Sequence, residues 1–215
     1  PADDKISAEV HPTWRHDSAG FFLITDRDSG YPYVAYYDIA SATMEKRYAY
    51  SWEVELVALS SDDRYLAVTV NEDGYFKLHI YDLANGDEVN IPQPPKGVVS
   101  GYGTLSWSPT GHKLLFTLSS GKRPESVWLL DVDADLLRAV TTADMHGLSQ
   151  DMLCEPHLMR FTSFDGLEVP FWLYVPHGAE MKNLPVVVEI HGGPEGQELA
   201  TFNPFIQYLV SEGIA

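Results

Sequence analysis

The sequence predicts a mainly β chain, in which an incomplete β-propeller is followed by the opening part of an α/β domain. Three observations support this fold class. They are a strand-rich repeat before residue 140, a hairpin signal at Asp165-Gly166, and an apolar run that leads into Gly192-Gly193. A period in the forties with several short strands per unit is typical of propeller blades.

The repeat consists of three segments that align with one another: WRHDSAGFFLITDRDSGYPYVAYYDIASAT, VALSSDDRYLAVTVNEDGYFKLHIYDLANGD and LSWSPTGHKLLFTLSSGKRPESVWLLDVDAD. In each segment a polar turn precedes one strand, and a loop leads to a second strand that ends in an aspartate. These aspartates, Asp38, Asp82 and Asp131, are 44 and 49 residues apart. We expect each of them to cap the turn after its strand rather than to take part in chemistry.

Three blades do not close a ring, because propellers have at least four. We therefore expect residues 1–140 to form about three blades of an incomplete propeller, with Pro1 inside a larger ring. Residues 141–160 interrupt the repeat and are predicted to be a linker. Residues 161–215 are predicted to begin a second domain.

The second domain opens with two strands around Asp165-Gly166, a dipeptide that favours a hairpin. Val186–Ile190 is a short β-branched run, which predicts a strand that is buried on both faces. Gly192 and Gly193 follow it, and glycines at such a position let the backbone approach a ligand closely.

A helix is predicted next, with Asn203 as its N-cap, Pro204 at its first position and Gly213 just past its end. Its expected apolar face consists of Phe205, Ile206, Leu209 and Val210. Ile214-Ala215 is expected to start the next strand.

Composition limits the partners. The 215 residues carry 14 Lys and Arg against 31 Asp and Glu, a formal net charge of −17. This acidity disfavours nucleic acid and anionic membrane surfaces, so we expect neither as a partner. No apolar run reaches the length of a membrane span, and the first residues show no signal peptide. The single Cys154 allows no intrachain disulfide, which fits the cytoplasmic location that we expect.

Hairpin, buried strand, glycine turn and helix, in this order, match the opening of an α/β-hydrolase sheet. Three motifs carry a closer resemblance: F-x-S-x-D-G from Phe161 to Gly166, LYVP from Leu173 to Pro176, and HGGPEGQ from His191 to Gln197. With blade-like repeats upstream, the chain resembles the prolyl oligopeptidase family of serine peptidases, in which a β-propeller precedes an α/β-hydrolase domain. The HGGP form is most similar to the acylaminoacyl-peptidase and dipeptidyl-peptidase-like branches.

The resemblance implies acyl transfer by a Ser-His-Asp triad, with an oxyanion held by backbone N–H groups. Gly193 is the residue whose N–H is implied to face the oxyanion. His191 and Gly192 are implied to shape the loop, and Pro194 to fix its exit. The triad follows this loop in the fold, and no complete G-x-S-x-G occurs in the sequence, since Gly147 to Asp151 lacks the second glycine. We therefore expect the parent protein to cleave oligopeptides and this chain alone to be inactive.

Other interpretations of the sequence stay open. An α/β-hydrolase acting on non-peptide esters has the same loop, although such esterases do not usually carry a propeller. A propeller that serves only as an interaction platform, with a degenerate hydrolase, is the alternative from another class. The eight histidines are scattered without metal-ligand spacing, so we expect neither a metal nor another cofactor. The full-length protein could assemble as a homo-oligomer.

Overall fold

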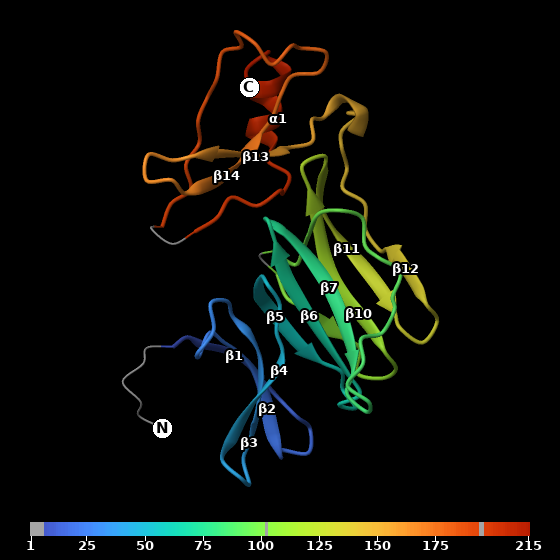
Figure 1. The fold of residues 1–215 in the computed structure, drawn as a ribbon. Helices are drawn as coiled ribbons and strands as arrows, with labels where there is room; N and C mark the ends of the chain where they lie inside the picture. The colour runs from blue at the N-terminus through green and yellow to red at the C-terminus, as the bar shows by residue number, and fades with distance from the viewer. Residues whose placement is uncertain (1–6, 102, 194–195) are drawn as a thin grey trace.

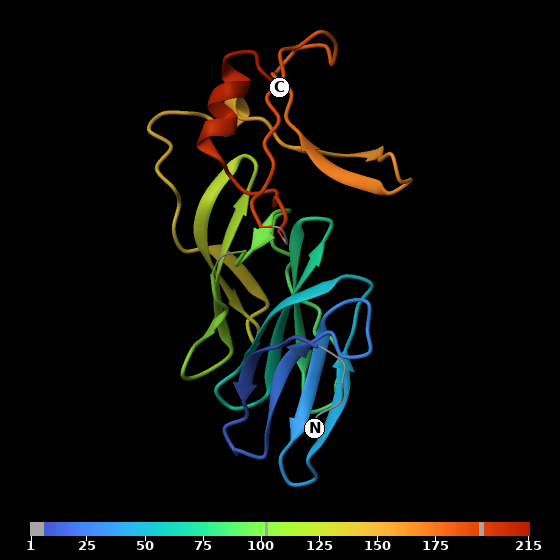
Figure 2. The ribbon, with the colours of Figure 1, turned by 90° about the vertical axis from the view of Figure 1, so that its left-hand side faces the viewer.

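A computed structural model describes residues 7–101, 103–193 and 196–215 of the chain (Figure 1, Figure 2). These residues form three β-sheets and one α-helix. The first two sheets contain the predicted repeats, and the third is a hairpin near the C-terminal helix (Figure 1). None of the described helices is long and apolar enough to cross a membrane.

The first sheet is an antiparallel unit of four strands that follow one another in sequence order. The strands are β1 (Glu9–Trp14), β2 (Gly20–Thr25), β3 (Tyr33–Asp38) and β4 (Thr43–Tyr48). The two central strands are largely buried, whereas β1 and β4 are mostly exposed. Of these, β2 and β3 are the two strands that the first repeat predicts, and β1 and β4 are additional strands on either side of them.

The second and third repeats form antiparallel units of the same kind. The second contains β5 (Glu53–Leu59), β6 (Tyr65–Glu72) and β7 (Tyr75–Asp82), and the third contains β9 (Ser106–Trp107), β10 (Lys113–Ser120), β11 (Arg123–Asp131) and β12 (Leu136–Ala139).

A short strand that the sequence does not predict, β8 (Val98–Val99), joins these two units. It pairs antiparallel with β10 and parallel with β7, so both units belong to one eight-stranded sheet. The three units are arranged as propeller blades are, but within the described residues they do not close a ring.

The units pack face to face, which explains why β6 has apolar residues on both of its faces from Tyr65 to Val70, with Thr69 as the one polar residue in that stretch. Because successive side chains of a strand point to opposite faces, alternate residues meet different neighbours. Tyr65 and Ala67 belong to the core shared with the third unit, whereas Leu66, Val68 and Val70 belong to the core shared with the first. A central blade covered on both faces therefore needs apolar residues at nearly every position.

The aspartates of the repeat cap turns, as predicted. Asp38, Asp82 and Asp131 are the last residues of β3, β7 and β11. Their Oδ1 atoms accept hydrogen bonds from backbone N–H groups two or three residues later, at 2.8, 3.0 and 3.2 Å respectively. Each carboxylate thus stabilises the turn that follows its strand.

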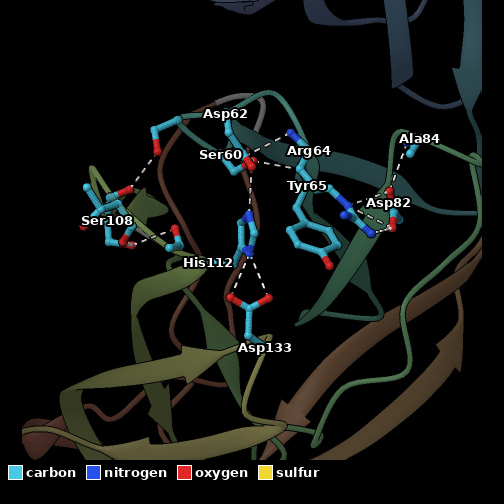
Figure 3. A network of polar contacts seen from close by, with 12 residues as sticks. Ser60, Asp62, Arg64, Tyr65, Asp82, Ala84, Ser108, His112 and Asp133 are labelled. Atoms are coloured by element: carbon cyan, nitrogen blue, oxygen red, sulfur yellow. Dashed lines mark hydrogen bonds and ion pairs between the residues drawn. The ribbon is translucent and has the colours of Figure 1, made fainter.

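Polar side chains connect neighbouring units at the turns before β2, β6 and β10. Nε2 of His112, in the third unit, lies 2.9 Å from Asp62 of the second, and its Nδ1 lies 2.8 Å from Asp133 of its own unit (Figure 3). On the other side of the second unit, Nδ1 of His16 lies 2.7 Å from Asp63. Two consecutive aspartates of one turn therefore contact a histidine of each neighbouring unit.

The predicted hairpin is present as β13 (His157–Thr162) and β14 (Glu168–Leu173). Gly166 lies in the turn with a φ of 88°, a left-handed conformation that glycine adopts without strain. A 3₁₀ turn, η1 (Gln150–Met152), precedes the hairpin. Because β13 begins at His157, the last residues of the predicted linker belong to this strand.

The predicted helix end signals are confirmed in α1 (Pro204–Ser211). Asn203 accepts hydrogen bonds from the N–H groups of Phe205 and Ile206 at 2.9 and 3.3 Å. At the other end, the N–H of Ile214 donates to Leu209 and that of Gly213 to Val210, a Schellman motif around a glycine with a φ of 81°.

Two expectations for the C-terminal part are wrong. Val186–Ile190 is not assigned as a strand, and its valines and isoleucine are 50% to 82% exposed. The side chains of such a run are buried only where other elements cover both faces of its sheet, and among the described residues the valines and isoleucine of this run stay exposed. The apolar face of α1 also differs, because Phe205 is 59% exposed and Gln207 is buried in its place.

Candidate active-site loop

The three described residues of the predicted loop, His191, Gly192 and Gly193, are all exposed. Pro194 lies outside the described residues. Nδ1 of His191 lies 2.8 Å from the carbonyl oxygen of Gly192, so the tautomer with a proton on Nδ1 donates a hydrogen bond to it. Through this hydrogen bond His191 stabilises the backbone of its own loop, as a residue that shapes a turn does. Gly193 has a φ of 156°.

Gly196 is a loop residue whose role the sequence analysis does not single out. A Cβ atom at this position would lie 2.8 Å from the carbonyl oxygen of Gly192 and 3.0 Å from Nδ1 of His191. Real Cβ atoms essentially never approach backbone so closely, so any side chain here would force the loop to shift. The sequence does contain an indication of this role, because Gly196 is the third glycine of the HGGPEGQ motif.

Hydrogen bonds to the hairpin of β6 and β7 hold the residues at the exit of the loop. Nδ2 of Asn71 donates to Oε1 of Gln197 at 2.7 Å, and the N–H of Ala200 donates to the carbonyl oxygen of Gly74 at 3.3 Å. From the hairpin side, Nε1 of Trp172 donates to the carbonyl oxygen of Glu198 at 2.8 Å. Residues 197–200 are therefore fixed by the second blade and by β14.

A second set of contacts holds α1 at the turn between β10 and β11. Nε2 of Gln207 donates to the carbonyl oxygens of Gly121 and Cys154 at 2.9 and 2.8 Å, and its Oε1 accepts from the N–H of Cys154 at 2.9 Å. Close by, Oγ of Ser119 accepts from the N–H of Phe202 at 3.0 Å. The sequence gives no signal for Gln207, since its three partners are backbone atoms of distant residues.

The entry to the loop shows the beginning of strand pairing. The N–H of Val187 donates to the carbonyl oxygen of Ala215, and the N–H of Ala215 donates to that of Pro185, both at 2.9 Å. In a parallel pair of strands, the N–H and C=O of one residue bond to two residues of the other strand that are two positions apart. The expectation that Ile214-Ala215 begins a strand is consistent with these two bonds.

Burial raises the pKa of two groups close to the contacts that hold the loop and α1. Burial raises the pKa of the Glu55 carboxyl, and a hydrogen bond from Asn71 partly offsets the effect. Burial also raises the pKa of the Cys154 thiol, which lies 3.1 Å from the carbonyl oxygen of Val175. Cys154 is therefore a neutral core residue, not an activated nucleophile.

The described residues contain neither a serine–histidine pair nor a metal site. Within ranges 7–101, 103–193 and 196–215, no serine hydroxyl is hydrogen-bonded to a histidine ring, and no group of His, Cys, Asp and Glu could hold a metal ion. A cavity of about 720 Å³ lies between β7, residues 93–97 and the start of β13, but His191, Gly192 and Gly193 do not line it. The exposed loop can offer backbone N–H groups to an anion.

No protein-family model matches the sequence, and no curated protein matches it. Solved structures do match. A puromycin-hydrolyzing peptidase of Mycobacterium tuberculosis has 21% identity and a TM-score of 0.81, and a puromycin hydrolase has 24% identity and the same TM-score. For both, the match covers 97% of this chain and 32% of the other. Prolyl oligopeptidase B of Galerina marginata, solved with a 35-residue substrate, has 13% identity and a TM-score of 0.82 over 98% of this chain and 29% of its own.

These structural neighbours are peptidases of the prolyl oligopeptidase family. The chain spans about a third of their length, 32% for both puromycin-hydrolysing enzymes. At identities below 25% the similarity concerns the fold. Over nearly all of its residues, the chain has the fold of the corresponding part of prolyl oligopeptidase family peptidases.

Proposed function

We propose that this chain is part of a serine peptidase of the prolyl oligopeptidase family, which hydrolyses oligopeptides by acyl transfer. The observation that carries the proposal is the exposed loop at His191-Gly192-Gly193, whose exit is hydrogen-bonded to a blade. The match in fold to peptidases over 97% of the chain supports it. In this proposal residues 1–140 are propeller blades, 141–160 a linker and 161–215 the beginning of an α/β-hydrolase domain.

In the proposed reaction, the loop acts on the carbonyl oxygen of the scissile bond. A serine hydroxyl, which gives its proton to a histidine oriented by an aspartate, attacks the carbonyl carbon, and the oxygen becomes negatively charged. The N–H of Gly193 donates to this oxygen, more strongly in the tetrahedral intermediate than in the substrate. His191 and Gly192 hold the turn that aims this N–H. In this proposal the serine, histidine and aspartate are supplied by a catalytic domain of the full-length protein.

The blades would restrict access to this reaction. Asn71 and Gly74 on one hairpin, and Ser119 and Gly121 on another, contact the C-terminal part directly. In this proposal, substrates reach the catalytic loop past the propeller, which favours short flexible peptides over folded proteins. The substrate is therefore proposed to be an oligopeptide.

The proposal is tested with a fluorophosphonate that labels activated serines. We expect the 215-residue chain not to be labelled, because its sequence contains no complete G-x-S-x-G. A polypeptide that joins this chain to a complete catalytic domain should be labelled stoichiometrically and should cleave oligopeptide amides. Cleavage of esters without peptides would support the esterase alternative, and a catalytic domain without a labelled serine would support the interaction platform.

A further inference from the structure

We propose that Asn71 is a positioning residue for the candidate oxyanion loop: through Gln197 it fixes the end of the loop on the second blade. The inference rests on the proposed function, since it assigns a blade residue a part in placing the N–H of Gly193. It concerns a contact between residues 126 positions apart in the sequence.

The side chain of Asn71 is held in one orientation. It is 6% exposed, and its amide makes three hydrogen bonds. Nδ2 donates to Oε1 of Gln197 at 2.7 Å and to Oε1 of Glu55 at 3.0 Å, while Oδ1 accepts from the N–H of Gly74 at 3.0 Å. Because β6 carries Asn71 and β5 carries Glu55, two blade strands and one blade turn set the place at which Gln197 is bound.

Gln197, the residue that Asn71 holds, is adjacent to a closely packed part of the loop. Gln197 follows Gly196, whose backbone lies so close to the carbonyl oxygen of Gly192 that a Cβ atom would be only 2.8 Å from it. Because the two backbones are this close, we expect a displacement of Gln197 to move Gly196 and to disturb Gly192. The peptide bond after Gly192 contains the N–H of Gly193. Three residues thus connect the blade to the proposed oxyanion donor.

Other contacts at the exit do not replace this one. The bond from Ala200 to Gly74 and the bond from Trp172 to Glu198 both hold main-chain atoms farther along the chain. Gln197 is itself exposed, so little burial holds it when the hydrogen bond is lost. Asn71 is therefore the blade side chain that holds Gln197, the held residue nearest to Gly196.

The contact is tested first by amide hydrogen exchange of residues 191–200 in the 215-residue chain. Gln197→Ala removes the tie from an exposed position and leaves the bonds of Asn71 to Glu55 and Gly74 intact. Gln150→Ala is the matched control, since Gln150 is also an exposed glutamine but lies in η1. We expect exchange in 191–200 to accelerate about 2- to 10-fold in Gln197→Ala, as for the loss of one hydrogen bond, and not in Gln150→Ala.

Asn71→Ala and the double variant, Asn71→Ala with Gln197→Ala, complete a double-mutant cycle for this contact. If one contact carries the effect, the double variant exchanges no faster in 191–200 than Asn71→Ala alone. Unchanged exchange in Gln197→Ala overturns the inference, whatever the function of the protein is.

The role in catalysis is tested in the polypeptide that carries a complete catalytic domain. We expect Gln197→Ala to lower kcat by roughly tenfold with little change in KM, because a misplaced donor weakens transition-state binding more than substrate binding. Gln150→Ala should match the parent. Faster loop exchange with an unchanged kcat overturns the positioning role. An inactive parent overturns the proposed function, and with it the role of Asn71, while the exchange experiment still reports on the contact.

Discussion

His112 and Asp62 connect two neighbouring blades, with Nε2 of the imidazole 2.9 Å from Oδ2 of the carboxylate. Asp133 holds the other ring nitrogen at 2.8 Å, so the ring lies between two carboxylates (Figure 3). Tyr65 meets the ring edge-on at 4.7 Å between centroids. Burial opposes the charged form of His112, but the hydrogen bonds to Asp62 and Asp133 outweigh it and raise its pKa. The same contact lowers the pKa of Asp62 to about 2.

The first prediction concerns the dependence of stability on pH. The pKa of His112 is higher in the folded state than in the unfolded state. Its contribution to the free energy of unfolding is therefore complete below the unfolded pKa of about 6.5, and it is lost as pH rises through the folded pKa. We expect His112→Asn to lower the free energy of unfolding by about 1 kcal/mol at a pH of about 6, and by less at a pH of about 9. Urea unfolding at both pH values measures the difference.

A matched control for this prediction is His146→Asn, because His146 is an exposed histidine outside the blade contacts. A destabilisation by His112→Asn that is equal at both pH values would mean that the ring acts by packing alone. On the acid side, the contribution of Asp62 should be lost only as pH falls from its unfolded pKa of about 4 through its folded pKa of about 2.

The second prediction concerns Gly196. Gly196→Ala places a methyl group against the carbonyl oxygen of Gly192, so the loop has to move. We expect the amide resonances of Gly192 and Gly193 to shift in an NMR spectrum, with signals of the blade core unchanged. Gly30→Ala is the control, because a Cβ atom there meets nothing within 4 Å. Unchanged resonances at Gly192 would show that the two segments are not in contact.

The third prediction concerns the buried glutamine of α1. Gln207→Leu keeps the volume roughly but removes three hydrogen bonds, and it leaves the N–H and carbonyl groups of Cys154 without these partners. Buried polar groups without partners cost about 1–3 kcal/mol each, so we expect a loss of roughly 2–4 kcal/mol in the free energy of unfolding of the C-terminal part. Gln150→Leu, at an exposed position, should stay within about 0.5 kcal/mol. Hydrogen exchange of α1 amides measures both.

Local patterns in the sequence predicted much of the fold. Strand ends at Asp38, Asp82 and Asp131 follow from turn chemistry between adjacent residues, and the ends of α1 follow from Asn203 and Gly213. Each of these signals acts over a few residues, so no tertiary information is needed to interpret them.

The features that depend on distant residues could not be predicted in this way. Val186–Ile190 has the composition of a buried strand, but burial depends on neighbouring strands that composition does not specify. Asn71 and Gln207 are ordinary polar residues in the sequence, and only the fold brings Gln197 or Gly121 to them. For the candidate site, the glycines were therefore recognisable from the motif, whereas the residues that hold the loop were not.

The last prediction concerns Gly193 in the polypeptide with a complete catalytic domain. If Gly193 has the proposed role, a side chain at this position crowds the acyl group and turns the N–H away from the oxyanion. We therefore expect Gly193→Val to lower kcat on the order of 10²- to 10³-fold, the usual cost of one oxyanion donor, with a melting temperature close to that of the parent. A loop that serves only as a structural turn predicts the reverse: a lower melting temperature, with kcat per folded molecule preserved. Thermal melts and kinetics normalised to titrated active sites, both on this variant, separate the two cases. If kcat per titrated site stays within a few-fold of the parent, the N–H of Gly193 does not bind the oxyanion.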